Sequence, residues 1–164
     1  MKMSKLIIVE PSPIISAGLL RYLEDMTQLQ VVSVLDNVDD LQDKMIVHNP
    51  DILIINPLTF GYMNNNYIRQ INQNNPSTTC IALVTTYIDR NYLKFFKEFI
   101  ELGDNKQKVL NKIINLINSS DDTINQNDSI DLSNREIDVL VCVAKGMTNK
   151  DISDILNISV HTVI

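Results

Sequence analysis

The feature that most constrains the fold is a series of short, continuous apolar runs that return at intervals along the first two thirds of the chain. The runs show no alternation of polar and apolar residues and are too short to be typical of helices. A strand of this composition is buried on both faces, as in a parallel sheet that is covered by helices on each side. The runs are Lys5–Val9, Val31–Val34, Asp51–Ile55, Cys80–Val84 and, more briefly, Phe99–Leu102.

Segments with helical spacing separate these runs. Ser12 is a suitable N-cap and Pro13 suits the first helical position, which predicts a helix directly after the first strand. Further helices are predicted over Asp39–His48, around Tyr67–Asn72, through Tyr92–Phe96 and over Lys106–Asn118. Alternation of strands with helices predicts an α/β domain over residues 1–118, with a doubly wound, parallel, five-stranded sheet.

The composition changes after this domain. Residues 119–131 are polar and rich in acids, which is typical of a linker. Residues 132–164 form a separate, all-helical segment, in which Ser133 and Glu136 have the spacing of a capping box and Gly146 ends the first helix.

A second helix is predicted to begin at Thr148 or Asn149, with an apolar stripe of Ile152, Ile155 and Leu156. After a tight turn, Ser159 is placed to cap a third helix. Two short helices joined by such a turn are the pattern of a helix-turn-helix.

Composition limits the possible functions. Among the 164 residues, 45% are hydrophobic, which supports a packed core, and the net charge of -6 is opposite to that of a bulk nucleic-acid binder. Cys80 and Cys142 lie in apolar runs without a ligand pattern, so we expect two buried thiols and no zinc site. The N-terminus lacks the pattern of a signal peptide, and no apolar stretch reaches the ~20 residues that cross a bilayer. We therefore expect a cytoplasmic protein with no membrane contact.

Several polar residues follow the predicted strands. In an open parallel sheet, functional residues gather at the carboxyl ends of the strands. Glu10 and Pro11 follow the first strand, Asn56 the third, Thr85 the fourth, and Leu102 lies at the end of the fifth.

This layout resembles the receiver domain of bacterial response regulators, which has a flavodoxin-like fold. The resemblance covers residues 4–118 in order. It rests on Val9-Glu10-Pro11-Ser12-Pro13 with the following Ala17-Gly18-Leu19, on the segment Pro50–Asn56, and on Leu83-Val84-Thr85 followed by Tyr92-Leu93.

The resemblance implies a functional site that has lost its main chemistry. A working receiver holds Mg²⁺ with two adjacent acids and accepts a phosphoryl group on an aspartate. Glu10 retains one acid, but Pro11 offers no ligand, although Mg²⁺ prefers hard carboxylate oxygens. Asn56 stands at the acceptor position, and its amide is not a nucleophile that makes an acyl phosphate.

The remaining positions of the receiver pattern are mixed. Thr85 retains the hydroxyl that senses the phosphoryl group, Leu102 falls where the family has a lysine, and Phe99 falls at the position of the family's switch aromatic. We therefore predict an atypical receiver without metal or cofactor, for which a histidine kinase does not act as phosphodonor. The simpler interpretation of Glu10 and Thr85 is that they only cap strand ends.

The C-terminal segment resembles the DNA-binding domain of the LuxR/NarL family, which belongs to two-component systems. This resemblance implies a transcription regulator, not an enzyme, that binds DNA as a homodimer. The matching positions are Leu132, Arg135, Glu136, Val139, Leu140, Ala144, Gly146, Asn149, Lys150, Ile152, Leu156, Ile158, Ser159, Thr162 and Val163.

Six residues of this segment are candidates for contacts with DNA phosphates, although a capping or solvent-exposed role suits each of them equally well. They are Thr148, Asn149, Lys150, Ser159, His161 and Thr162. Residues 132–164 contain three bases and four acids, which is a weak electrostatic basis for binding DNA. We expect this helix-turn-helix domain to be incomplete at its C-terminus.

Three hypotheses follow. The first is a DNA-binding regulator whose receiver is not phosphorylated. The second is a protein-interaction or dimerisation module that does not bind DNA in this form. The third, a metal-dependent phosphotransfer protein, requires aspartate at position 11 or 56 and is disfavoured by Pro11 and Asn56.

Overall fold

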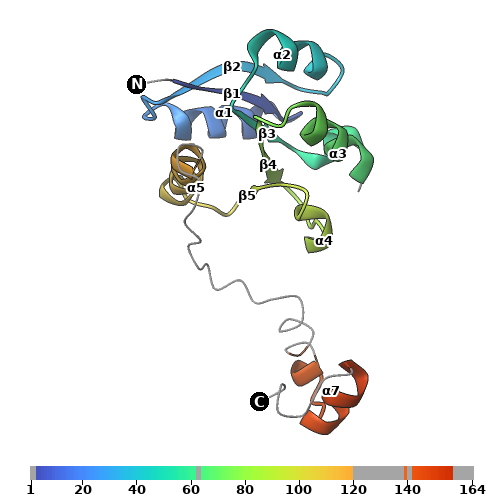
Figure 1. Ribbon diagram of the computed structural model, residues 1–164. Coiled ribbons are helices and arrows are strands. Elements are labelled where there is room, and N and C mark those ends of the chain that lie inside the picture. The colour runs from blue at the N-terminus through green and yellow to red at the C-terminus, as the bar shows by residue number, and fades with distance from the viewer. Residues whose placement is uncertain (1–2, 62–63, 120–138, 140–141, 157–164) are drawn as a thin grey trace. The chain divides into compact units, whose positions relative to one another are not determined.

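The computed structural model describes residues 3–61, 64–119, 139 and 142–156. The chain forms two compact units, residues 1–123 and 124–164. The first contains a five-stranded sheet with the order β2-β1-β3-β4-β5, in which all neighbouring strands are parallel (Figure 1). The strands are β1 (Ser4–Val9), β2 (Leu29–Leu35), β3 (Ile52–Ile55), β4 (Thr79–Val84) and β5 (Glu98–Glu101).

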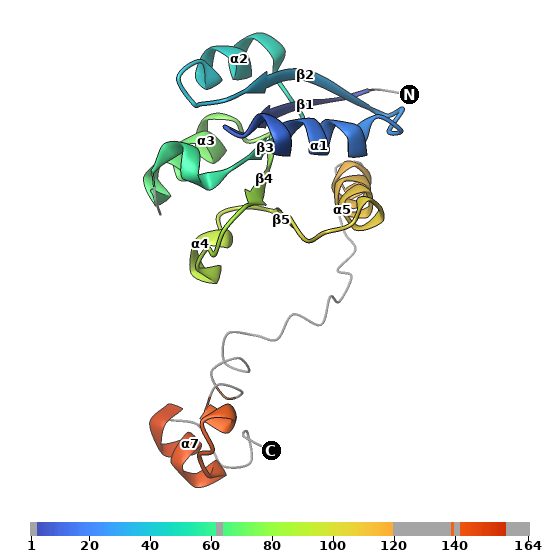
Figure 2. The same ribbon diagram turned by 180° about the vertical axis from the view of Figure 1, so that it is seen from behind.

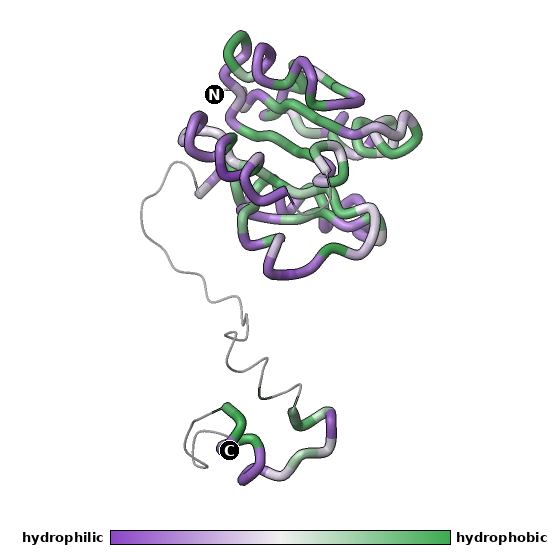
Figure 3. The backbone as a smooth tube through the Cα atoms, turned by 90° about the vertical axis from the view of Figure 1, so that its right-hand side faces the viewer, coloured by the Kyte–Doolittle hydropathy of each residue, from purple (hydrophilic) through white to green (hydrophobic). Residues whose placement is uncertain are grey.

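Helices cover both faces of this sheet (Figure 2), as the two-sided apolar strands predict. One face packs against α1 (Pro13–Leu23) and α5 (Lys106–Ser119). The other packs against α2 (Leu41–His48), α3 (Asn65–Asn74) and α4 (Arg90–Leu93). Figure 3 shows the apolar segments of this unit along the strands, between helices that carry polar residues. The doubly wound α/β prediction is confirmed.

The strands divide their side chains between two cores, as the pleat requires. Leu6 and Ile8 of β1 pack on the side of α1 and α5, whereas Ile7 and Val9 pack on the side of α2 and α3. All four side chains are fully buried. This two-sided burial explains why the strand shows no polar alternation in its sequence.

Local signals set the ends of several helices as predicted. Ser12 caps α1 by accepting a hydrogen bond from the backbone N–H of Ile15, and Pro13 occupies the first turn. At the C-terminal end of α2, Asn49 adopts a left-handed conformation with φ of 44°. Asparagine tolerates this conformation better than most residues.

The predicted helix through Tyr92–Phe96 is wrong in extent. Asp89 caps α4 by accepting a hydrogen bond from the N–H of Asn91, but the helix ends at Leu93. Four residues later, the N–H of Lys97 donates to the carbonyl of Cys80 in β4 (2.9 Å). Because the chain must return to the sheet at this point, the helix has no room to continue.

The C-terminal unit contains α7 (Asn149–Leu156). Gly146 ends the preceding helical turn with φ of 74°, and its N–H donates to the carbonyl of Val143 while that of Met147 donates to Cys142. These two bonds form a Schellman motif, as the glycine predicts.

One prediction for α7 is wrong. Ile152 is fully buried, but Ile155 is 60% exposed and so does not belong to the buried stripe. The predicted capping box at Ser133 and Glu136 and the third helix at Ser159 lie outside the described residues. The predicted linker 119–131 also lies outside them, apart from Ser119 at the end of α5. The domain boundaries at 118 and 132 stay predictions.

Cys80 and Cys142 are both buried and free, as expected. In the part of the chain that the structure describes, no helix has both the length and the apolar character needed to cross a membrane.

Candidate functional site

The candidate site lies where the strand order reverses direction. Strand β1 lies between β2 and β3, so the chain leaves β1 toward one side of the sheet and later returns to the other. A crevice at the carboxyl edge of a parallel sheet forms at such a point. Val9 is paired with Ile55 in the sheet, so Glu10 and Asn56, the next residue of each strand, lie beside one another. The backbone N–H of Asn56 donates to the carbonyl of Val9 (2.9 Å).

The side chain of Asn56 joins three strand ends. Its Nδ2 donates to Oε2 of Glu10 (2.9 Å) and to Oγ1 of Thr85 (3.1 Å), which follows β4. Its Oδ1 accepts a hydrogen bond from the backbone N–H of Leu58 (3.0 Å), because Asn56 is the N-cap of the 3₁₀ helix η1 (Pro57–Phe60). Since a backbone N–H needs an acceptor, this bond sets the amide oxygen toward Leu58 and leaves the NH₂ group facing Glu10.

Glu10 is held by neutral donors alone. Its second oxygen, Oε1, accepts a hydrogen bond from the N–H of Ser12 (2.7 Å). Glu10 and Asn56 are both only 3% exposed. A buried carboxylate is costly unless its oxygens are hydrogen-bonded, and here each oxygen has a donor. Among the described residues, no group of three His, Cys, Asp or Glu side chains is arranged to hold a metal ion.

The structure brings together Glu10, Asn56 and Thr85, which the sequence analysis identified separately. It does not bring Pro11 or Leu102 into this network. Pro11 is exposed at the surface beside Glu10, and Leu102 is 56% exposed after the end of β5. Because Val84 pairs with Glu101, Leu102 lies level with Thr85, but an aliphatic side chain there has no charge with which to pair with an anion.

Phe99 lies apart from this network in the structure. It belongs to the edge strand β5, and its ring contacts Nζ of Lys112 at 4.9 Å from the ring centre. Lys112 also donates to the carbonyl of Phe99 (2.6 Å). These contacts connect Phe99 to α5, and its predicted role as a switch aromatic stays a prediction.

A buried charge cluster at the end of β5 was missed by the sequence analysis. Asp104 accepts hydrogen bonds from Nζ of Lys112 (2.9 Å) and from the N–H of Glu101 (3.0 Å), and it forms a salt bridge with Lys108 (2.5 Å). Burial by itself raises the pKa of Asp104, but the hydrogen bonds from Lys108 and Lys112 outweigh this and lower the pKa to about 2. The spacing of four residues between Asp104, Lys108 and Lys112 was the available signal.

The described candidates for DNA contact lie at the start of α7. The hydroxyl of Thr148 donates to Asp151 (2.6 Å), and the N–H of Asp151 donates back to that hydroxyl oxygen (3.3 Å). Thr148 therefore caps the helix, whereas Asn149 and Lys150 are exposed. Ser159, His161 and Thr162 lie outside the described residues.

Comparisons with known proteins match both halves of the chain. The family described as "Bacterial regulatory proteins, luxR family" matches residues 131–164. The oxygen regulatory protein NreC of Staphylococcus haemolyticus (strain JCSC1435) is 26% identical, over 97% of this chain and 85% of that protein. The isolated REC domain of RcsB from Salmonella enterica serovar Typhimurium is 17% identical with a TM-score of 0.63, over 71% of this chain and 90% of that domain.

The same order of domains occurs in a longer structure. RcsB from the same organism, bound to promoter rprA, covers 99% of this chain and 87% of its own, with 19% identity and a TM-score of 0.61. The signal receiver domain of the putative response regulator NarL from Mycobacterium tuberculosis is 10% identical over 75% of this chain and all of that domain, with a TM-score of 0.62.

The C-terminal residues 131–164 thus match the luxR family of bacterial regulatory proteins, and the first unit has the fold of receiver domains. A receiver fold in the first unit is followed by a luxR-family segment in the second. In this receiver fold, Asn56 places an amide at the position where the receiver pattern has an acceptor aspartate.

Proposed function

We propose that this chain is a response regulator of the LuxR/NarL type that controls transcription by binding DNA, and that its receiver works without phosphorylation at Asn56. The observation that supports the second part is the bridging amide. Both hydrogen-bonding faces of Asn56 are engaged, by Glu10 and Thr85 on one side and by Leu58 on the other.

The chemistry of phosphoryl transfer explains why this arrangement is unsuitable for it. Formation of an acyl phosphate requires a carboxylate oxygen that attacks phosphorus, with positive charge nearby to neutralise the phosphoryl oxygens. Asn56 offers no such oxygen, and Glu10 would face the incoming anion with its own negative charge. Leu102 supplies no positive charge level with Thr85. A histidine kinase therefore has no acceptor at this position.

Intact-mass measurement after incubation with acetyl phosphate and Mg²⁺ tests this part. We expect no added mass for the wild-type protein, because the amide is not a nucleophile. The double variant Pro11→Asp/Asn56→Asp, which supplies the missing carboxylates, is the matched positive comparison. An adduct of one phosphoryl group on the wild type that disappears in Asn56→Ala would refute the proposal.

For DNA binding, the support is the luxR-family segment and the exposed Asn149 and Lys150 at the start of α7. Solved structures show RcsB bound to a promoter and two RcsB dimers bound to two parallel DNAs. We propose the same mode here: a homodimer that binds DNA in the cytoplasm through its helix-turn-helix. Gel shifts at low salt with the 164-residue chain test this, and failure to bind would refute it.

A second candidate function is a protein-interaction module that does not bind DNA. It is favoured by the excess of acids over bases in residues 132–164, since affinity for DNA depends on neutralising phosphates. Lys150→Ala separates the two functions. If the segment contacts phosphates, this substitution lowers both the affinity for DNA and the dependence of that affinity on salt. If the module acts on protein alone, the substitution changes neither quantity.

A further inference from the structure

The loops at one edge of the sheet contain acids but no lysine or arginine. Five loops follow the carboxyl ends of the five strands and so meet at this edge: residues 10–12, 36–40, 56–61, 85–89 and 102–105. We call them the carboxyl edge. They contain six acids and no lysine or arginine. All other residues together contain equal numbers of acids and bases, so these six acids equal the net charge of -6. The six acids are Glu10, Asp36, Asp39, Asp40, Asp89 and Asp104.

Three of these acids are exposed to solvent, although Asp36 also accepts a hydrogen bond from Nδ2 of Asn37. Glu10 is buried in the network with Asn56, and Asp104 is paired with two lysines. Asp36, Asp39 and Asp40 are all exposed, and none of them forms a salt bridge with a described residue. They lie within the five residues that follow β2, which concentrates a negative field at this end of the carboxyl edge.

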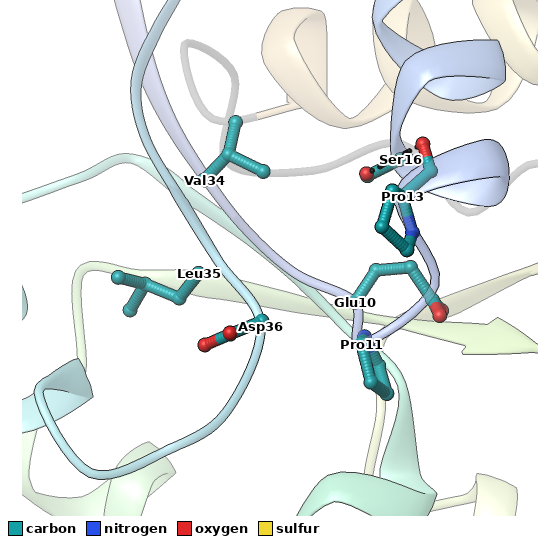
Figure 4. Close-up of a pocket in the computed structure, with 7 residues that line it drawn as sticks. All are labelled: Glu10, Pro11, Pro13, Ser16, Val34, Leu35 and Asp36. Carbon is teal, nitrogen blue, oxygen red and sulfur yellow. Dashed lines mark hydrogen bonds between the residues drawn. The ribbon is translucent and has the colours of Figure 1, made fainter.

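An apolar hollow of about 360 Å³ opens beside these three acids. Figure 4 shows the end of β2 on one side of the hollow and the turn between β1 and α1 on the other. Its apolar lining includes Pro11, Pro13 and Val34, and Asp36 stands at its wall. Val34 is 42% exposed on the edge strand β2 and so leaves apolar surface open to a partner.

Apolar side chains are also exposed along the rest of the carboxyl edge. Leu58 after β3, Tyr87 after β4 and Leu102 after β5 are 40%, 80% and 56% exposed. Several exposed apolar residues bordered by charges of one sign are typical of a protein interaction site.

We propose that the carboxyl edge is a docking surface for a cationic, amphipathic segment of a partner protein. An apolar side chain of that segment fills the hollow between Pro11, Pro13 and Val34, while its lysine or arginine side chains meet the three exposed acids. The charge selects this occupant among the alternatives. DNA and an anionic membrane surface are repelled, and so is the same edge of a second copy, because like charges placed opposite one another are unfavourable.

The proposal goes beyond the proposed function and does not depend on it, because the exposed side chains that would make the docking contacts do not include the buried Asn56. Its test uses three synthetic peptides of equal length on the full chain: one of lysine and leucine, one of glutamate and leucine, and one of lysine and serine. Affinity is measured by calorimetry, and backbone amide shifts locate the site. We expect only the lysine–leucine peptide to bind tightly, with shifts concentrated on residues 10–14, 34–40 and 58–60.

Two double variants with the same change of net charge decide whether the edge is specific. Asp39→Asn/Asp40→Asn removes two exposed acids of the edge, and asparagine keeps a residue suited to the N-cap of α2 at position 40. Glu24→Gln/Asp25→Asn removes two exposed acids elsewhere. We expect the first to weaken binding of the lysine–leucine peptide by about tenfold, the sum of two exposed charge contacts, and the second to change it little.

Val34→Ser tests the apolar contact, and Pro11→Ser is used instead if Val34→Ser unfolds. We expect each variant to lower the affinity for the lysine–leucine peptide and to leave the weak affinity for the lysine–serine peptide unchanged. Equal loss in both double variants, shifts spread over the whole surface, equal binding of the glutamate–leucine peptide or no binding at all would each overturn the proposal. None of these results bears on phosphorylation or on the gel shift, so the two proposals fail separately.

Discussion

Replacing the bridging amide by a carboxylate should make the stability of the receiver strongly dependent on pH. In Asn56→Asp, a carboxylate oxygen takes the place of Nδ2 at 2.9 Å from Oε2 of Glu10. Two unit charges at this distance repel by about 6 kcal/mol at an effective dielectric constant of about 20. One of the two carboxyl groups avoids this repulsion by taking up a proton, which then donates to the other as the amide does in the wild type.

The cost of that proton sets the size of the effect. A carboxyl group with an ordinary pKa of about 3.9 is protonated at pH 7 at a cost of about 4 kcal/mol. This is less than the repulsion, so we expect Asn56→Asp to lower the free energy of unfolding at pH 7 by about 4 kcal/mol. The variant's folded state binds one more proton than its unfolded state above pH 4, so its stability falls as the pH rises, by about 1.4 kcal/mol for each pH unit.

Urea unfolding followed by circular dichroism between pH 5 and pH 8, with EDTA present, measures this effect. The double variant Glu10→Gln/Asn56→Asp is the matched control, because it contains one amide and one carboxylate with their positions exchanged. Its glutamine accepts from the N–H of Ser12 and donates to the new aspartate, so we expect stability within about 1 kcal/mol of the wild type, the net value of one hydrogen bond. A single variant as stable as the wild type at pH 7, or a double variant no more stable than the single one, would refute the reasoning.

Three further predictions concern other parts of the chain. Tyr92 is buried and its hydroxyl has no hydrogen-bond partner among the described residues, so Tyr92→Phe should raise the free energy of unfolding by about 1 kcal/mol. A decrease of that size in the free energy of unfolding would instead show that the hydroxyl is hydrogen-bonded. The folded pKa of Asp104 is about 2, below its usual 3.8, so its contribution of about 2 kcal/mol to the free energy of unfolding is complete above pH 4 and is lost as the pH falls toward 2. Acid unfolding of Asp104→Asn should lack this pH dependence. An acid unfolding profile equal to that of the wild type would contradict the role of the cluster. Thr148→Ala should destabilise the C-terminal unit by about 1 kcal/mol because it removes the cap of α7, whereas Thr148→Ser should not, and hydrogen exchange of α7 amides would detect the difference.

The sequence predicted the architecture of the first unit well because its strands are buried on both faces. All five strands lie within two residues of their predicted positions, and the caps at Ser12 and Gly146 are where they were expected. The errors have local physical causes. The helix after Asp89 stops at Leu93 because Lys97 must already bond to β4, a demand that no local pattern contains. Periodicity placed Ile155 on the buried face of α7, but the structure leaves it exposed.

The proposed loss of phosphoryl chemistry is a prediction from the sequence, because it depends on which atoms Pro11, Asn56 and Leu102 carry. The contacts that Asn56 makes could only be seen in the fold. Asn56 and Glu10 are 46 residues apart, and their hydrogen bond exists because the pairing of β1 with β3 places the two side chains together. The direction of the amide is set by a backbone N–H at Leu58. The sequence by itself therefore determined which functional groups the site contains, and the proposed reactivity follows from those groups. The bridge between three strand ends was decided by tertiary structure, because it depends on distances between residues far apart in the chain.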